Sequence, residues 1–153
     1  MRLFRFALVV PIALGALALM STPASAKHRT TTSVSTQLSI GQAQLGPLGA
    51  SVSVPLTFTC DPTLNVAFGD ATVIQVSGHK LAQGSGSFVN NFPGEPCTGA
   101  SETATVQVNA VGVFAFKQGK KTIGSADLIL FDPVAGTLST TSVTGQAITI
   151  TKK

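Results

Sequence analysis

Side chains capable of chemistry are few, and their spacing assembles no familiar catalytic set. The chain of 153 residues holds two histidines, six carboxylates and two cysteines. His28 lies in a polar stretch near the N-terminus, and His79 lies between Gly78 and Lys80 in an expected hairpin turn. A general base at either position would need a carboxylate to orient it. We expect both histidines to be solvated.

The carboxylates have structural explanations. Asp61-Pro62 and Asp132-Pro133 are turn-initiating pairs. Asp127 falls inside a strand pattern, where it should face solvent or pair with a lysine. No group of histidines, cysteines and carboxylates has the spacing of a zinc or calcium site. We therefore expect no catalytic residues, no metal and no cofactor.

The glycine-rich segment 84–87, Gly-Ser-Gly-Ser, does not match a catalytic motif either. It lacks the pattern of a nucleophile elbow, and no Gly-Lys-Ser/Thr or following helix makes it a phosphate-binding loop. Small residues inside a strand indicate a bulge or the close approach of another backbone. The sequence therefore favours a protein that is not an enzyme.

Cys60 and Cys97 are the only cysteines in the chain. In an exported protein they are expected to form a disulfide, which leaves no thiol nucleophile. The bridge would join the end of a strand to the loop that contains Cys97. On the chain-entropy model it would stabilise the fold by about 4 kcal/mol.

Two groups of side chains could bind a ligand. Lys117, Lys120 and Lys121 surround one turn and could contact an anionic cell-wall polymer or phosphate, although a solvated hairpin tip is the alternative. An apolar cleft could be lined by some of four phenylalanines, which are Phe88, Phe92, Phe114 and Phe116. No tryptophan or tyrosine is present to stack on sugars or bases.

Residues 1–26 have the pattern of a secretory signal peptide. A short basic start precedes an uncharged apolar run from Phe6 to Met20, and a small-residue cleavage signature ends at Ala26. The apolar run is shorter than a membrane-spanning helix requires, although an uncleaved leader acting as an anchor is the alternative. Cleavage would remove Arg2 and Arg5 and lower the net charge from +4 to +2, which disfavours a nucleic-acid binder. We expect a secreted protein with no membrane span after cleavage.

The rest of the chain predicts an all-β fold. Residues 27–33 read as a flexible tail, and period-two alternation dominates 34–153. The clearest strand is 51–60, in which Pro55 suggests an edge position or a bulge. These patterns predict an antiparallel β-sandwich of about seven strands. Further strands are expected at 34–40, at 64–77 with a bulge at Gly69-Asp70, and at 81–89, 104–110, 113–116 and 122–131. A threonine-rich stretch, 137–144, follows, and Ala147, Ile148 and Ile150 belong to the expected closing strand.

Three motifs carry a resemblance to a known group of proteins. They are Leu81 to Ser87, Cys97-Thr98-Gly99 followed by alternating threonine and valine, and Phe116 to Lys121. Across about residues 50–132 the chain resembles small secreted immunoglobulin-like β-sandwich proteins of actinobacteria. That group has no established activity. The resemblance implies the fold and export, and nothing about chemistry.

The leading hypothesis from sequence is an exported, non-enzymatic interaction or structural module of the extracellular space or cell envelope. Its partner would be an extracellular protein or a cell-wall polymer. One alternative is a carrier of small hydrophobic ligands that uses the phenylalanine cleft. Another alternative is an inhibitor of secreted proteases, with Phe92 to Cys97 as an exposed loop braced by the disulfide.

Overall fold

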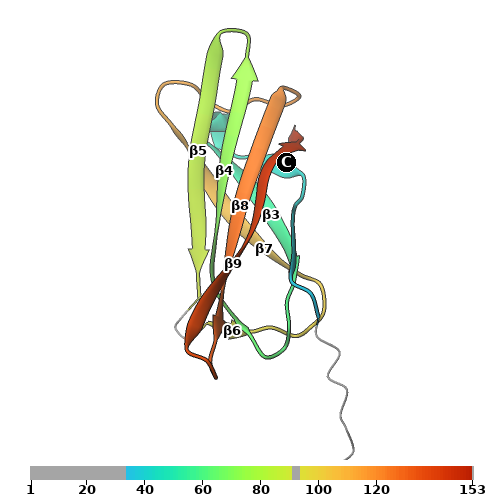
Figure 1. Cartoon of the computed structure of the whole chain (residues 1–153). Helices are drawn as coiled ribbons and strands as arrows, with labels where there is room; N and C mark the ends of the chain where they lie inside the picture. The colour runs from blue at the N-terminus through green and yellow to red at the C-terminus, as the bar shows by residue number, and fades with distance from the viewer. Residues whose placement is uncertain (1–33, 91–93, 153) are drawn as a thin grey trace, which may run out of the picture. The chain divides into compact units, whose positions relative to one another are not determined.

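The computed structural model describes residues 34–90 and 94–152, and these residues form strands, turns and one short 3-10 segment (Figure 1). The all-β prediction is confirmed. The expected signal peptide (1–26), the expected tail (27–33) and Phe92 lie outside the described residues. The elements are β1 (Gln37–Ile40), β2 (Ala43–Leu45), η1 (Pro47–Gly49), β3 (Ser51–Thr59), β4 (Asn65–Ser77), β5 (Lys80–Val89), β6 (Glu95–Pro96), β7 (Glu102–Val111), β8 (Lys121–Asp132), β9 (Thr137–Ile148) and β10 (Ile150–Lys152).

These strands belong to one hydrogen-bonded sheet that curls into a half-barrel. Its order is β10-β2-β3-β7-β5-β4-β8-β9, with β1 paired to β3 and β6 paired to β4. All pairs are antiparallel except β10 with β2. The expected seven-stranded antiparallel sandwich is therefore not confirmed.

The parallel pair has a simple physical origin. β9 pairs with β8 at one side of the sheet, and Thr149 alone separates it from β10, which pairs with β2 at the other side. A one-residue crossing cannot reverse the direction of the chain, since even a tight hairpin needs two loop residues. The last strand therefore enters the opposite edge in the direction that β9 already has.

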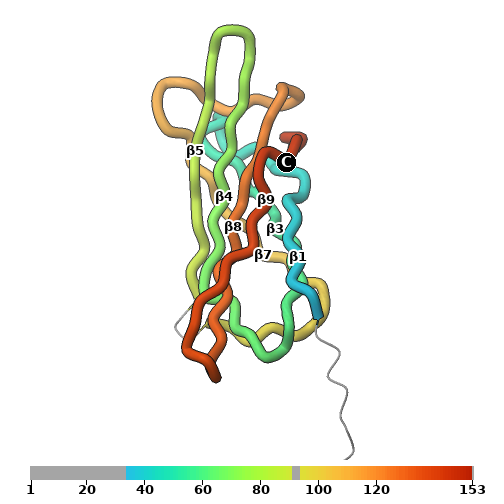
Figure 2. The backbone as a smooth tube through the Cα atoms, in the orientation of Figure 1, coloured from blue at the N-terminus to red at the C-terminus, as the bar shows by residue number. Residues whose placement is uncertain are grey.

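A glutamine side chain joins the same two edges further along. The amide of Gln146 on β9 donates to the Ile40 carbonyl oxygen at 2.8 Å, and its Oε1 accepts from the Ile40 N–H at 3.3 Å. Figure 2 shows β1 beside β9 at this place. The side-chain amide occupies the position of a peptide group in a ladder, so the curled sheet is bridged where its backbones do not pair.

Two glycines allow the sheet to fold over where β5 meets β7, on the side opposite the junction of β1 and β9. β5 pairs with β7 through only three residues, Gln83 to Ser85. A Cβ on Gly84 would lie against the Asn109 carbonyl, and one on Gly86 would lie against the Gln107 carbonyl. The close backbone approach predicted for segment 84–87 is confirmed, and only a residue without a side chain fits there.

The core lies inside the curl and has two parts. The larger part collects the inward residues of β3 and β7, of which Val52, Val54 and Val106 are fully buried. The smaller part packs Leu128 and Leu130 of β8 around the two cysteines. The alternation predicted for 51–60 is confirmed, because Val52, Val54, Leu56, Phe58 and Cys60 are all buried.

The prediction that Pro55 marks an edge strand or a bulge is wrong, because β3 is an interior strand in unbroken register with β7. β3 has β7 on one side and β1 followed by β2 on the other. The Pro55 carbonyl accepts from the Gly41 N–H at 2.8 Å, between the end of β1 and the start of β2. Proline is tolerated in an interior strand here because its missing N–H faces the break between two partner strands.

Two other local predictions are wrong. The bulge in β4 lies between Val66 and Phe68, and Gly69 and Asp70 stay in regular register with β8. Residues 113–116 form no strand; they belong to the loop 112–120 between β7 and β8. The apolar pattern of that segment reflects one buried side chain, Phe116, and three that are exposed, Val113, Phe114 and Ala115.

Gly86→Ala is expected to lower the free energy of unfolding by about 3 kcal/mol, because the added methyl must displace the β7 backbone. Chemical denaturation monitored by far-UV circular dichroism measures this change. Ser87→Ala, at the neighbouring exposed position of β5, is the control and should change the free energy by less than about 0.5 kcal/mol. Equal effects of the two substitutions would contradict the close approach.

Candidate functional site

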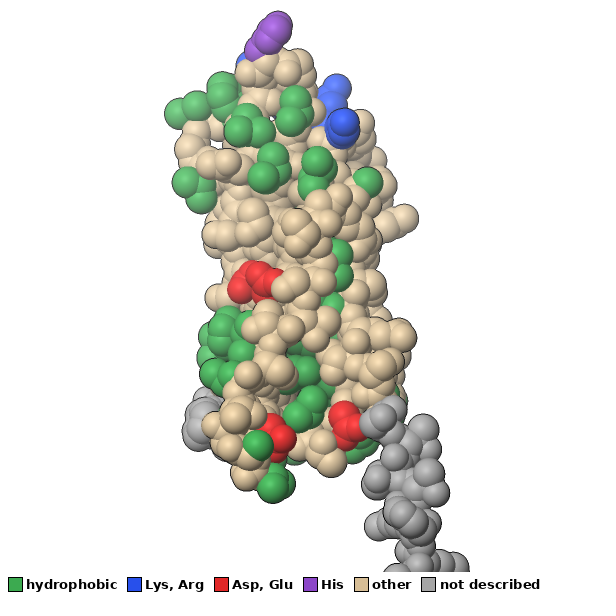
Figure 3. Space-filling model, in the orientation of Figure 1, with side chains coloured by type: hydrophobic (Ala, Val, Ile, Leu, Met, Phe, Trp, Pro, Cys, Tyr) green, Lys and Arg blue, Asp and Glu red, His purple; other side chains and the backbone are tan. Residues whose placement is uncertain are grey.

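The charged residues are segregated along the domain. The five described lysines, with His79, lie at one end, which we call the lysine end and which is uppermost in Figure 3. The six carboxylates lie midway along the domain or at the other end, called the carboxylate end. The lysines are Lys80, Lys117, Lys120, Lys121 and Lys152, and the carboxylates are Asp61, Asp70, Glu95, Glu102, Asp127 and Asp132.

Strand register establishes this separation. On β4, Ser77 pairs with Lys80 of β5, whereas Val66 pairs with Glu95 of β6. Eleven residues of extended chain separate these rows, or about 35 Å. Lys121 pairs with Val76, next to the first row. The lysines are therefore remote from the carboxylates that could neutralise them.

The loop 112–120 brings Lys117 and Lys120 to this end and is anchored in two ways. Phe116 is 2% exposed and inserts into the core, while its N–H donates to the Gly49 carbonyl at 2.9 Å. Gln75, which is 1% exposed, holds the backbone of Lys117: its amide donates to the Lys117 carbonyl at 2.7 Å, and its Oε1 accepts from the Lys117 N–H at 2.7 Å. The Lys117 backbone is thus fixed although its side chain reaches solvent.

Two hollows adjoin the loop. The larger, of about 800 Å³, lies between the turn 46–49 and residues 115–118, and Lys117 and Lys152 are among its lining residues. The smaller, of about 210 Å³, is lined by Lys80, Phe114 and again Lys117. Ammonium groups are hydrogen-bond donors only, so this arrangement suits an anionic ligand.

The three lysines predicted from sequence to contact an anion, Lys117, Lys120 and Lys121, lie at the lysine end, and two lysines outside that prediction lie there as well. Lys80 arrives by the β4–β5 hairpin, and Lys152 arrives by the parallel pairing of β10 with β2. The hairpin turn at Gly78-His79 was visible in the sequence. Its place beside the loop 112–120 depends on the long-range order of the sheet, which gives no local signal.

Of the four phenylalanines predicted to contribute to an apolar cleft, Phe92 lies outside the described residues and the other three do not line one common hollow. Phe116 lines the larger hollow and Phe114 the smaller. Phe88 lies against Gly69, six residues along β4 from Gln75, and packs on both parts of the core. That spacing corresponds to about 20 Å of strand.

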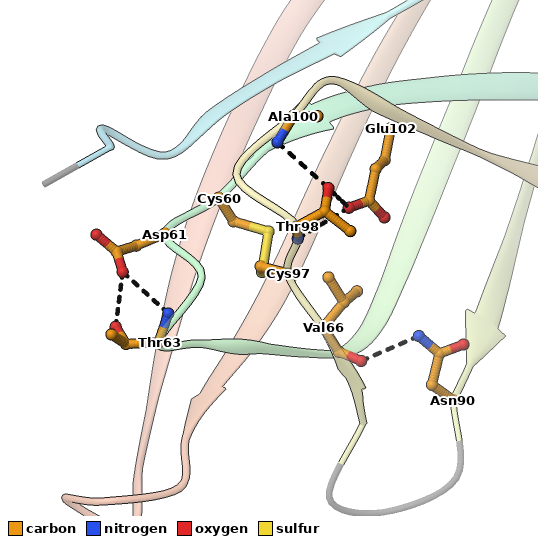
Figure 4. The surroundings of a disulfide bond; sticks show 9 residues. All are labelled: Cys60, Asp61, Thr63, Val66, Asn90, Cys97, Thr98, Ala100 and Glu102. Carbon is orange, nitrogen blue, oxygen red and sulfur yellow. Dashed lines mark hydrogen bonds between the residues drawn. A yellow bond between two sulfur atoms is a disulfide. The ribbon is translucent and has the colours of Figure 1, made fainter. Parts of the chain in front are cut away.

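The disulfide is confirmed at the carboxylate end (Figure 4). Cys60 and Cys97 are bonded with their Cα atoms 5.7 Å apart, and both are buried. Asp61 beside it accepts from the N–H and hydroxyl of Thr63, at 3.0 and 2.7 Å. These bonds lower the pKa of Asp61, consistent with the turn-forming role predicted for it.

Part of the segment 92–97, the expected inhibitor loop, is paired to the sheet. Glu95 and Pro96 form β6 and pair with Val66 and Asn65 of β4, and both are exposed. The inhibitor alternative stays a prediction.

Asp70 and Asp127 face each other across β4 and β8, midway along the domain. Partial burial, followed by repulsion from Asp127, raises the pKa of Asp70. No third histidine, cysteine or carboxylate joins them in a group that could hold a metal ion, as far as the structure describes the chain. Among the same residues no helix is long and apolar enough to cross a membrane.

No family model and no curated protein matches this sequence.

Gln75→Leu is expected to lower the free energy of unfolding by about 2 kcal/mol, because the Lys117 peptide group loses both of its partners. The Lys117 amide should also exchange its hydrogen faster under native conditions, as measured by NMR. Gln83→Leu, on the exposed face of β5, is the control. Unchanged exchange at Lys117 in Gln75→Leu would show that Phe116 alone fixes the loop.

Asp70→Asn is expected to raise the free energy of unfolding at pH 7 by about 0.5–1 kcal/mol, because like charges directly opposite in a sheet are destabilising. The raised pKa means that the folded state keeps a proton above pH 3.8, where the unfolded chain loses it. Stability of the natural protein therefore falls as pH rises through the folded pKa, and the advantage of the variant should vanish below pH 3.8. Urea denaturation at pH 3 and pH 7 measures both values, and a pH-independent difference would contradict this account.

Proposed function

We propose that this protein is an exported, non-enzymatic interaction module that binds an anionic partner through the lysine end. The observation that carries the proposal is the segregation of the five described lysines from all six carboxylates. Lysines scattered over a surface are ordinarily paired or solvated, but a concentration of one sign of charge raises the local density of counter-ions and of charged partners. The hollow lined by Lys117 and Lys152 gives such a partner a place to seat.

Export is supported by two features. The buried Cys60–Cys97 disulfide fits an extracellular protein. The pattern of residues 1–26 is that of a secretory leader, and the resemblance to exported immunoglobulin-like proteins agrees with it. The proposed partner therefore lies outside the cell, at the envelope.

The non-enzymatic part of the proposal rests on the arrangement of the reactive groups. Both cysteines are in the disulfide, and His79 is exposed at the tip of the β4–β5 hairpin. The facing pair Asp70 and Asp127 lies midway along the domain, whereas His79 lies beyond the last row of the same strands. Nucleophile, base and oxyanion donors must lie within hydrogen-bond reach to act together.

The mature protein should bind inorganic polyphosphate, used as a probe of anion binding, with an affinity that falls as salt is raised. The triple substitution Lys80→Gln, Lys117→Gln and Lys121→Gln should weaken binding by about twentyfold, measured by fluorescence anisotropy with labelled polyphosphate.

The matched control changes the net charge by the same amount at the carboxylate end. The control variant places glutamates at three exposed positions of β9, as Thr137→Glu, Ser139→Glu and Thr140→Glu. It should weaken binding much less than the lysine substitutions do. Equal loss in the two triple variants would show that net charge, and not the lysine end, determines binding. That result would remove the proposed site.

A further inference from the structure

Exposed apolar side chains are interspersed with the lysines. Leu48 and Val113 are 98% and 89% exposed, and Val76, Leu81 and Phe114 are exposed to a lesser degree. We call these five residues the apolar rim. Single exposed apolar residues are normal on a protein surface, but a group that surrounds a cluster of one charge indicates a binding surface.

The contacts show that rim and lysines form one continuous surface. Val76 pairs with Leu81 on one side and with Lys121 on the other. The Lys80 ammonium lies 5.6 Å from the centroid of the Phe114 ring. Lys117 lines both hollows, and Leu48 lines the larger one. Figure 3 shows apolar side chains beside and below the lysines, and below His79, on the face in view.

Leu48 is held in a strained conformation. Its φ is 55°, in the left-handed region that favours glycine, and no other described residue with a side chain has a positive φ. The turn 46–49 therefore accepts strain at the residue that projects an almost fully exposed leucine. Strain of this kind is retained where the surrounding structure imposes it, and it concentrates at functional sites.

We propose that the anionic partner is a lipid bilayer surface, with lysines on the lipid phosphates and the apolar rim inserted between headgroups. The proposal rests on the proposed function and names the partner class of the same end. An anionic polymer would satisfy the lysines and leave Leu48 and Val113 in water, whereas a lipid interface accepts both kinds of side chain.

The dimensions agree with interfacial insertion. Below the rim, a second exposed apolar row crosses the sheet at Ile74, Ile123 and Val111. Three residues of strand separate Ile74 from Ser77 at the hairpin, or about 10 Å. Interfacial segments bury their apolar groups to about 5–10 Å, so the rim and this row fall within the reach of the headgroup region.

The chain contains no tryptophan or tyrosine, so the fluorescence of a single introduced tryptophan reports only on the position of that residue. Val113→Trp places an indole on the rim, and Val134→Trp places one at a 93% exposed position next to Asp132, at the carboxylate end. With vesicles of equal phosphatidylglycerol and phosphatidylcholine, the first should shift its emission to the blue and the second should not. No shift at position 113, or equal shifts at both positions, would overturn the proposal.

Flotation with the same vesicles separates the contribution of the apolar rim to vesicle binding from that of the lysines. Leu48→Ser with Val113→Ser should weaken vesicle binding by about tenfold and leave polyphosphate binding unchanged. The triple lysine-to-glutamine variant should weaken both, by about fivefold per lysine for vesicles. Val134→Ser is the matched control for loss of an exposed valine.

The outcomes distinguish the two proposals. The lipid proposal is overturned if the protein binds polyphosphate but not vesicles. It is also overturned if the apolar substitutions leave vesicle binding unchanged. In both cases the lysine end remains an anion site. Binding to neither probe overturns both. Equally strong binding to pure phosphatidylcholine and to the mixed vesicles also overturns the lipid proposal. The proposal requires attraction between the lysines and anionic lipid in addition to insertion of the apolar rim.

Discussion

The close approach of β5 to β7 is the constraint on which the rest of the domain depends. At Gly84 and Gly86 one backbone meets another with no side chain between them. This contact lets a single sheet turn sharply enough to enclose its own core. Once the sheet has turned, its two outer edges face each other and must be joined without continuing the backbone ladder. The crossing at Thr149 and the side-chain amide of Gln146 provide that junction.

Glutamine performs the same task at two places in this fold. Gln146 pairs with the Ile40 backbone between edges, and Gln75 pairs with the Lys117 backbone beneath the loop 112–120. In both cases one side-chain amide supplies the donor and the acceptor that a neighbouring strand would have supplied. The two ends of the domain are consequently stabilised by different means. The carboxylate end has a covalent bridge, and the lysine end has buried polar contacts that position an exposed charged loop.

Alternation along the chain predicts the strands β3, β5 and β8, because each depends on local pattern. The cysteine count, together with the expected export, predicts the disulfide. The order of the strands was not accessible in this way. One curled sheet and two packed sheets bury the same alternate residues, so Val52, Val54 and Leu56 carry no signal that separates them. Pro55 predicts an edge position or a bulge, because the break between β1 and β2 that accommodates it lies in a different segment. The Lys117–Lys121 turn is visible in the sequence as a cationic cluster. The positions of Lys80 and Lys152 near this turn depend on pairings between segments that are remote in sequence.

The segregation of charge among the described residues makes this part of the chain an electric dipole, with its positive pole at the lysine end. A charged surface exerts a torque on such a molecule as well as a force, and the torque acts at separations up to about a Debye length, roughly 8 Å at physiological salt. An anionic surface would therefore turn the lysine end toward itself before any side chain touched it. Orientation during approach reduces the fraction of collisions that occur with the wrong face, so the charge distribution governs the rate of encounter as well as its strength.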